Sequence, residues 1–281
     1  MKLFSLIVNY KNKNSHALAE NIIKRLRREQ INLLLPPDRP GFSTHDKTPI
    51  DLSGVDMLIV LGGDGTILAS SKLLAGQDTP IFAINMGQVG FLSEVEPDEA
   101  MDALEVLIRG EYYIEKRIKL NGNVIRNGQI IESQHSLNDF IISNNIFSRT
   151  IMFDVFCNNQ QVSDYRADGI IIATPTGSTA YSLSAGGPIA TPSMDFMIIT
   201  PVCTHGFFSR PLIVPSDAVV DIFYRSKSGT GNFVCDGQNH FLLEQNDLIR
   251  IVRSEQTANF VRFNDYSFFK TVKSKLLKGK M

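Results

Sequence analysis

The hydrophobic periodicity of this 281-residue chain changes near Glu115, and this change limits the fold more than any other feature of the sequence. Before it, short apolar runs such as Leu3–Val8 and Met57–Leu61 alternate with stretches in which apolar residues recur every three or four positions. Buried strands that alternate with amphipathic helices are typical of βαβ units around a parallel sheet. The first part is therefore predicted to be an α/β domain with a Rossmann-like parallel sheet.

One amphipathic helix is predicted near the start of this part. Ser15 is in position to cap a helix whose inner face consists of Ala19, Ile22, Ile23 and Leu26. These apolar residues follow helical spacing, and a serine hydroxyl can accept a hydrogen bond from the first turn.

After Glu115 the periodicity is mostly two, and turn dipeptides separate the apolar runs. Asn127-Gly128 lies between two such runs, and Asn158-Asn159 lies between another two. Asn-Gly between alternating segments predicts a type I′ hairpin, because both central residues tolerate positive φ. The second part is predicted to be an all-β domain, a β-sandwich. The basic Lys273–Lys280 stretch is predicted to be a solvated tail.

Composition excludes several classes of protein. Lys and Arg number 28 against 29 for Asp and Glu, so the net charge of -1 argues against a nucleic-acid binder or a polybasic membrane protein. No run of about 18 uncharged apolar residues occurs, and the first residues lack the pattern of a cleaved leader. Three separated cysteines favour a reducing compartment. We expect a cytoplasmic protein that does not bind nucleic acid or membranes.

The segment Gly62-Gly63-Asp64-Gly65-Thr66 lies between a predicted buried strand and the start of a helix. Glycines let a phosphate approach backbone N–H groups, and a helix N-terminus favours negative charge. A carboxylate beside a phosphate is unfavourable unless Asp64 accepts a proton from an attacking hydroxyl or helps to hold Mg²⁺. The alternative is a tight turn in which Asp64 caps the helix. The segment matches neither a Walker A loop nor the dinucleotide fingerprint.

A second segment, Asp168–Pro188, contains an apolar run that leads directly into Thr174–Pro188, a stretch rich in hydroxyls and glycines. Small residues allow a flat ligand to approach the backbone, and hydroxyls can bind ribose and base. The alternative is a cluster of Ser/Thr turns, because these residues are common in loops.

Four segments together resemble the bacterial NAD kinases, and the resemblance covers nearly the whole chain. They are Gly62–Thr66, Gly87–Leu92, Leu137–Asp139 and Thr174–Pro188. The first segment alone is shared with lipid kinases, whereas the last is more specific. The resemblance implies transfer of the ATP γ-phosphoryl group to the 2′-hydroxyl of the adenosine ribose of NAD, which gives NADP and ADP.

The resemblance also implies a domain division. Residues 1–116 would form the α/β domain, completed by 262–281, and residues 117–261 would form a β-rich NAD-binding domain. In such proteins the active site lies between the two domains.

The resemblance assigns roles to individual residues. Asp64 would accept the proton of the ribose 2′-hydroxyl, Gly65 would belong to the phosphate-facing loop, and Phe91 would form a wall of the adenine pocket. Asn138 and Asp139 would hold the dinucleotide, although the family often has Glu at the latter position. The other implied contacts with substrate or cofactor are Arg149, Arg166, Asp168, Thr179, Ala180, Tyr181, Ser182, Leu183, Ser184 and Gln238.

A divalent cation, Mg²⁺ or Mn²⁺, is expected to bridge the nucleotide phosphates, with no ligands assigned from the protein. By resemblance we expect a homodimer or homotetramer. For His205, two readings stay open: an acid–base residue, or a histidine that is satisfied in the core or in a turn. Three other functions remain open: a lipid kinase, an NAD-dependent oxidoreductase, and a nucleotide-binding sensor without turnover.

Overall fold

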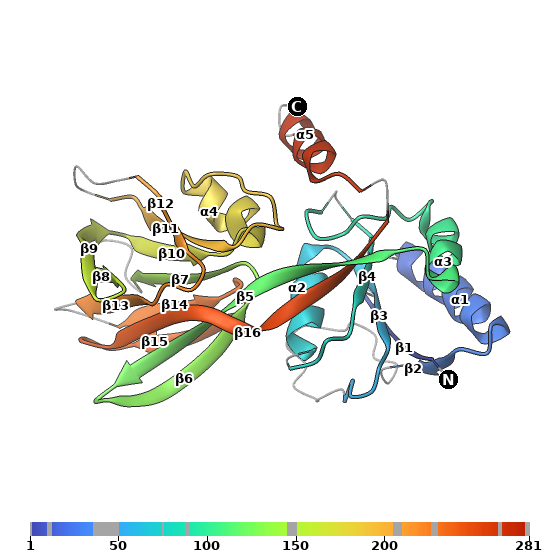
Figure 1. Cartoon of the computed structure of the whole chain (residues 1–281), viewed down its shortest axis with the longest axis horizontal. Helices are drawn as coiled ribbons and strands as arrows, with labels where there is room; N and C mark the ends of the chain where they lie inside the picture. The colour runs from blue at the N-terminus through green and yellow to red at the C-terminus, as the bar shows by residue number, and fades with distance from the viewer. Residues whose placement is uncertain are drawn as a thin grey trace. The chain divides into compact units, whose positions relative to one another are not determined.

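The computed structural model describes residues 2–9, 13–35, 51–74, 76–87, 90–144, 151–204, 210–225, 230–263 and 266–278 (Figure 1). The chain forms two compact units. Unit 1 comprises Met1–Lys116 and Ala258–Met281, and unit 2 comprises Arg117–Thr257. Two long strands, β5 (Tyr113–Arg126) and β16 (Leu248–Arg262), contain residues of both units. None of the described helices is both long and apolar enough to cross a membrane.

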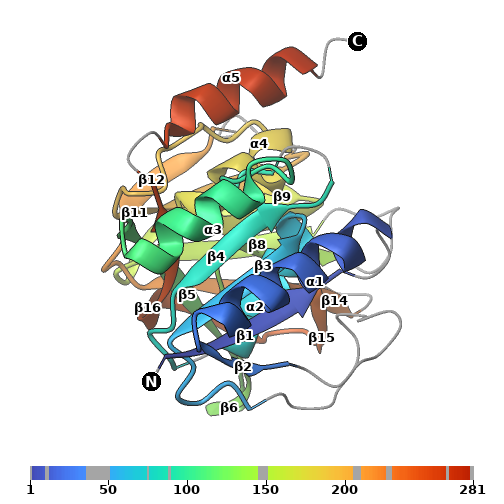
Figure 2. The same ribbon diagram turned by 90° about the vertical axis from the view of Figure 1, so that its right-hand side faces the viewer.

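Unit 1 contains a parallel sheet in the order β2-β1-β3-β4-β16, of which β16 contributes its last residues. Helices α1 and α3 lie on one face of this sheet and α2 lies on the other (Figure 1, Figure 2). The expected parallel α/β arrangement is confirmed. The elements are β1 (Leu3–Val8), α1 (Lys13–Arg28), β2 (Asn32–Leu34), β3 (Met57–Gly62), α2 (Asp64–Leu73), β4 (Ile81–Asn85), α3 (Ala100–Arg109) and α5 (Phe268–Lys278).

The core of unit 1 explains why α1 packs where it does. Ala19, Ile22 and Leu26 are buried against the strands, as their spacing predicts, and Ile23 is partly buried. The predicted cap is wrong, because the helix begins at Lys13 and Ser15 is buried inside its first turns.

The prediction of a solvated tail over Lys273–Lys280 is wrong at Lys275, which contacts Asp64 and Phe91, whereas Lys273 is exposed as predicted. Lys273–Lys278 belong to α5, and residues 279–280 lie outside the described residues. Phe268 of α5 is buried, and Val272, one turn later, is partly buried. Apolar residues four positions apart give the helix a face that can pack, and Lys270, which lies between them, is exposed.

Unit 2 is a sandwich of two layers. One layer contains β5, β6, β8, β9, β13 and the start of β16, and the other has the wholly antiparallel order β12-β11-β10-β7-β14-β15. Phe140 and Phe233 stack in its core at 4.9 Å between ring centroids. The predicted β-sandwich is confirmed. The elements are β6 (Gln129–Ser136), β7 (Asp139–Asn144), β8 (Ile151–Cys157), β9 (Gln160–Ala167), β10 (Gly169–Ala173), η1 (Thr176–Thr179), α4 (Tyr181–Ser184), β11 (Phe196–Val202), β12 (Leu212–Pro215), β13 (Val220–Arg225), β14 (Gly231–Cys235) and β15 (Asn239–Leu243).

The hairpin predictions are confirmed by the backbone. Asn127 and Gly128 have φ of 52° and 78°, and they join β5 to β6. Asn158 and Asn159 have φ of 49° and 63° between β8 and β9. Positive φ at both central residues matches the turn twist to the twist of the strands.

Candidate active site

Asp64 is the first residue of α2 and directly follows the turn after β3. Its Oδ2 accepts a hydrogen bond from the backbone N–H of Phe91 at 2.9 Å, and its Oδ1 accepts one from Leu92 at 3.2 Å. Gly63, not Asp64, is the N-cap residue of α2, so the alternative that Asp64 serves as the cap is wrong. Two charge-assisted hydrogen bonds fix the carboxylate. About a third of the side chain, 32%, is still exposed.

The glycines around Asp64 have two different tasks. A Cβ on Gly90 would lie 2.2 Å from Asp64 Oδ1, so only glycine lets the Phe91 loop approach the carboxylate. A Cβ on Gly63 or Gly65 would meet no atom within 4 Å. The open side of these two glycines is where a phosphate could reach the backbone without obstruction.

Lys275 of α5 also contacts this site, although no sequence motif predicts it. Its Nζ lies 3.6 Å from Asp64 Oδ2 and 3.9 Å from the centroid of the Phe91 ring. The only signal in the sequence was the apolar spacing of Phe268 and Val272, which indicates a packed helix. Phe91 is partly buried and has an ammonium group over its face.

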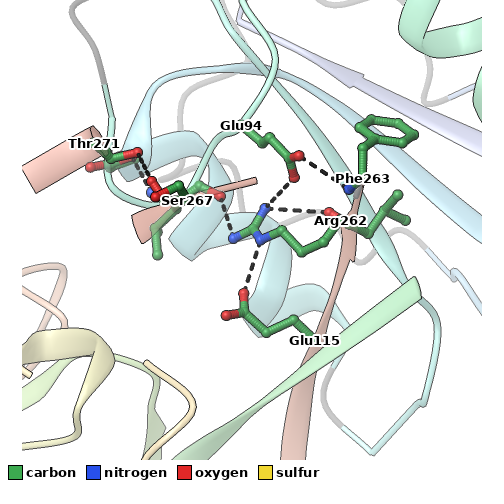
Figure 3. A network of polar contacts seen from close by, with 9 residues as sticks. Glu94, Glu115, Arg262, Phe263, Ser267 and Thr271 are labelled. Atoms are coloured by element: carbon green, nitrogen blue, oxygen red, sulfur yellow. Dashed lines mark hydrogen bonds and ion pairs between the residues drawn. The ribbon is translucent and has the colours of Figure 1, made fainter. Parts of the chain in front are cut away.

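A buried arginine anchors the segment that holds Asp64 (Figure 3). Arg262 is 1% exposed and lies at the end of β16. Its guanidinium pairs with Glu115 at 2.9 Å and with Glu94 at 3.6 Å, and it donates to the carbonyl oxygen of Leu92 at 3.3 Å. Glu94 in turn accepts the N–H of Phe263 at 3.1 Å. The Leu92–Glu94 segment is therefore tied to the strand that leads into α5.

In unit 2, the Asp236 carboxylate binds the segment Ser136–Asp139, which connects β6 to β7. Asp236 lies in the β14–β15 turn with φ of 50°. The local sequence, Asp236-Gly237, indicates only a turn, because nothing local shows which distant loop Asp236 contacts. Its carboxylate accepts the Ser136 hydroxyl at 2.6 Å and the N–H groups of Leu137, Asn138 and Asp139 at 3.0, 2.7 and 3.2 Å.

Asp139 is buried, with 3% of its surface exposed. Burial, together with the nearby Asp236 carboxylate, raises the pKa of Asp139 to about 7, and the backbone N–H of Tyr181 opposes part of this shift. Its Oδ2 has no hydrogen-bond partner among the described residues. Nearby, burial lowers the pKa of Lys119 to about 8, although the Asp236 charge opposes the change. An anionic Asp139 would therefore keep the Tyr181 N–H as a donor and would have no described donor at Oδ2.

Hydroxyls of the Thr174–Pro188 segment mostly bond to the protein itself. Thr174 Oγ1 donates to Leu137 O at 2.6 Å and accepts the N–H of Gly177 at 3.0 Å. A Cβ on Gly177 would lie 2.0 Å from Asn138 O, so the segment packs directly on the β7 loop. Three further hydroxyls bond internally: Ser178 to Pro175 O, Thr179 to Thr176 O, and Ser182 to Thr200.

The structure gathers the predicted residues into two groups. Asp64, Gly65 and Phe91 lie together in unit 1. In unit 2, Asn138 lies beside Gly177 and Asp139 lies beside Tyr181. Both neighbours belong to the Thr174–Pro188 segment, which also contains Thr179–Ser184. Gln238 follows in the turn that contains Asp236.

Other predicted residues are not brought into these groups by any described contact. Arg166 on β9 and Asp168 before β10 are exposed. Arg149 and His205 lie outside the described residues. Within the described part of the chain, no three His, Cys, Asp or Glu side chains are arranged to hold a metal ion.

Comparison with known proteins identifies the family. Residues 4–112 match the model of the ATP-NAD kinase N-terminal domain, and residues 137–263 match that of the ATP-NAD kinase C-terminal domain. The NAD kinase of Thermoanaerobacter sp. (strain X514) is 39% identical over 98% of this chain and 99% of the relative. The NAD kinase of Caldanaerobacter subterraneus subsp. tengcongensis is 41% identical over 85% of this chain and 84% of the relative.

Two solved structures share the fold. The yeast NADH kinase complexed with NADH has a TM-score of 0.88 at 24% identity, and the match covers 100% of this chain and 89% of that one. The NAD kinase from Archaeoglobus fulgidus in complex with ATP has a TM-score of 0.77 at 24% identity, with 98% of each chain covered. The resemblance seen in the motifs is confirmed, and this chain belongs to the ATP-NAD kinase family.

Proposed function

We propose that this chain transfers the γ-phosphoryl group of ATP to the 2′-hydroxyl of the adenosine ribose of NAD, which gives NADP and ADP, with Asp64 as the proton acceptor. Family membership supports ATP-dependent phosphorylation of NAD, the reaction that the motifs indicated. The observation that carries the role of Asp64 is its fixed, partly exposed carboxylate beside two glycines that leave open space.

The arrangement around Asp64 suits proton transfer. Each carboxylate oxygen accepts one N–H group from the Phe91 loop and has a further lone pair for the ribose hydroxyl. A positioned general base contributes typically about 10²–10⁴-fold to the rate. The open space beside Gly63 and Gly65, at the N-terminus of α2, is the proposed site for the donor phosphates.

Unit 2 supplies the proposed contacts with the dinucleotide. Asp139 Oδ2 is a buried acceptor without a described donor, and a ribose hydroxyl would satisfy it. Asn138, anchored by Asp236, is proposed to act beside it. Phe91 of unit 1 is proposed to contact adenine. The remaining proposed contacts are Arg149, Arg166, Asp168, Thr179, Ala180, Tyr181, Ser182, Leu183, Ser184 and Gln238.

A divalent cation is part of the proposal, held by the nucleotide phosphates. Mg²⁺ and Mn²⁺ prefer oxygen ligands and commonly keep several waters, so one carboxylate such as Asp64 fits a contact through water. When bound, the cation would neutralise charge on the phosphates. Enzyme treated with EDTA is expected to lose activity and to regain it with Mg²⁺. A homodimer or homotetramer and a cytoplasmic location complete the proposal.

One assay tests the function directly. The purified chain is incubated with ATP, Mg²⁺ and NAD, and NADP is measured with an NADP-specific coupling enzyme. Formation of NADP that requires ATP is expected. Phosphorylation of sphingosine or diacylglycerol in its place would indicate a lipid kinase, and reduction of NAD without ATP would indicate an oxidoreductase. Thermal stabilisation by the nucleotides without any turnover would indicate a sensor.

A further inference from the structure

Lys275 differs from the other described lysines of α5. Lys270 and Lys273 are exposed, whereas Lys275 is 26% exposed and lies against two residues of the candidate site. Its ammonium group is 3.6 Å from Asp64 Oδ2 and 3.9 Å from the Phe91 ring centroid. A solvated tail would not bring one lysine to the Asp64 carboxylate, which lies between Gly63 and Gly65 in the chain.

Stability alone is a weak reason for this contact. An ion pair with both partners partly exposed contributes little to folding, because water already solvates the two charges and both side chains lose rotamer freedom. The Phe91 ring adds a modest cation–π attraction. The position of Lys275 is informative because of the charge that the proposed reaction would bring to the same place.

A donor triphosphate adds negative charge next to the negatively charged Asp64. Like charges at short range in a partly desolvated site repel, so a nearby cation lowers the cost of bringing them together. A lysine ammonium has three donors on a flexible stem and can therefore bond to a carboxylate and to a phosphate oxygen together. Lys275 already touches Asp64, so little movement is needed for it to meet a phosphate oxygen.

We propose that Lys275 is a further residue of the phosphoryl-transfer site, where its ammonium group contacts the terminal phosphate of the donor nucleotide. This inference rests on the proposed function. Lys275 forms no covalent bond: the ribose hydroxyl oxygen bonds to the γ-phosphorus, its proton passes to Asp64, and the bond to the leaving ADP oxygen breaks. Without nucleotide the ammonium group pairs with Asp64.

The anchoring of α5 explains how its lysine is kept near the site. Arg262, the last residue of β16, is bound to Glu94, Glu115 and the carbonyl of Leu92 (Figure 3). The same Leu92 donates its N–H to Asp64. One buried guanidinium therefore connects the segment that orients Asp64 with the strand that carries α5.

The test compares Lys275→Met with Lys273→Met, which removes an exposed lysine of the same helix. For Lys275→Met we expect the KM for ATP to rise at least tenfold and kcat to fall about tenfold, with the KM for NAD within twofold of wild type. Lys273→Met should match wild type, and Lys275→Arg should recover part of the loss. Binding of a non-hydrolysable ATP analogue, measured by calorimetry, should weaken about tenfold in Lys275→Met only.

Several results would overturn the inference. One is that Lys275→Met and Lys273→Met have the same kcat and the same KM for ATP. Another is that kcat is higher in Lys275→Met than in wild type. The third is that Lys275→Met raises the KM for NAD as much as the KM for ATP. If Lys275→Met unfolds at a lower temperature, Lys275→Gln and the analogue measurement decide by the same criteria. A wild-type chain without NAD kinase activity would refute the proposed function itself, whereas an active wild type with unaltered variants refutes only the role of Lys275.

Discussion

The glycine-rich turn of unit 1 and the hydroxyl-rich segment of unit 2 use polar groups in opposite ways. In unit 1 the backbone donates to the side chain, because the N–H groups of Phe91 and Leu92 hold the Asp64 carboxylate. In unit 2 side chains bond mainly to backbone, because Thr174 and Ser178 direct their hydroxyls to carbonyl oxygens of the protein.

The two regions therefore differ in whether their polar side chains stay accessible to a ligand or stabilise the protein's own backbone. Asp64 is fixed and yet partly exposed, so its oxygens are available to a reacting group. The Thr174 and Ser178 hydroxyls are buried and donate to carbonyl oxygens of the protein, so they hold the backbone of the segment in place. Asp139 is the exception in unit 2, since it is buried and one of its oxygens has no described donor. Four variants test this contrast.

Asp64→Asn should have the largest effect. The amide has the same size but cannot accept the ribose proton, so kcat should fall about 10²–10⁴-fold, or about 3–5 kcal/mol in barrier height. The Kd for NAD, measured by calorimetry, should stay near the wild-type value. A purified variant with near-wild-type turnover would show that Asp64 is not the base.

Asp139→Asn should alter the pH dependence of stability. The pKa of Asp139 is about 7 against an ordinary 3.8, so the folded state keeps a proton that the unfolded state loses between these values. Wild-type stability should therefore fall as pH rises from about 4 to 7, by up to about 4 kcal/mol, and then level off. Asp139→Asn should lack this slope in denaturant unfolding at several pH values. The exposed control Asp168→Asn should keep it, and equal slopes in both variants would contradict the assignment.

Gly177→Ala tests the packing of the hydroxyl-rich segment on the β7 loop. The new Cβ would lie 2.0 Å from Asn138 O, and a backbone oxygen cannot move aside cheaply. We expect a loss of about 3 kcal/mol in unfolding free energy. Gly65→Ala has open space around its Cβ and should unfold like wild type, while its kcat/KM for ATP falls because phosphate no longer reaches the backbone. A loss of stability in Gly65→Ala would contradict the contrast between the two glycines.

Ser178→Ala should have the smallest effect of the four. Its Oγ donates to Pro175 O at 2.6 Å and accepts the N–H of Ala190 at 3.0 Å, both in buried surroundings. Loss of these bonds should cost about 1–2 kcal/mol in chemical denaturation. Ser184→Ala, an exposed change in the same segment, should stay within about 0.5 kcal/mol of wild type. Equal stabilities would mean that the Ser178 hydroxyl is not structural.

The pattern of neighbouring residues was sufficient to predict strands and turns that depend on short-range interactions. The run Leu3–Val8 became β1 with the same bounds, and Asn127-Gly128 formed the expected turn with both φ values positive. The Gly62–Thr66 turn and Asp64 could be identified because strand, glycines and helix start are adjacent in the chain. Periodicity and turn preference act over a few residues, so the sequence displays them directly.

Long-range contacts could not be read in the same way. Nothing near Asp236 in the sequence indicates that its carboxylate holds the Ser136–Asp139 backbone about a hundred positions earlier. The same is true of Lys275, which lies in a segment predicted to be solvated and yet meets Asp64.

The amino-acid sequence by itself determined the parallel α/β region, the β-sandwich, the glycine turn with its carboxylate and the family to which these motifs belong. The tertiary structure decided which side chains surround that carboxylate, which hydroxyls form hydrogen bonds within the protein and how deeply Asp139 is buried. The physical reason is that hydrogen bonding and desolvation depend on neighbours brought together by folding, whereas strand, helix and turn preferences belong to the local chain.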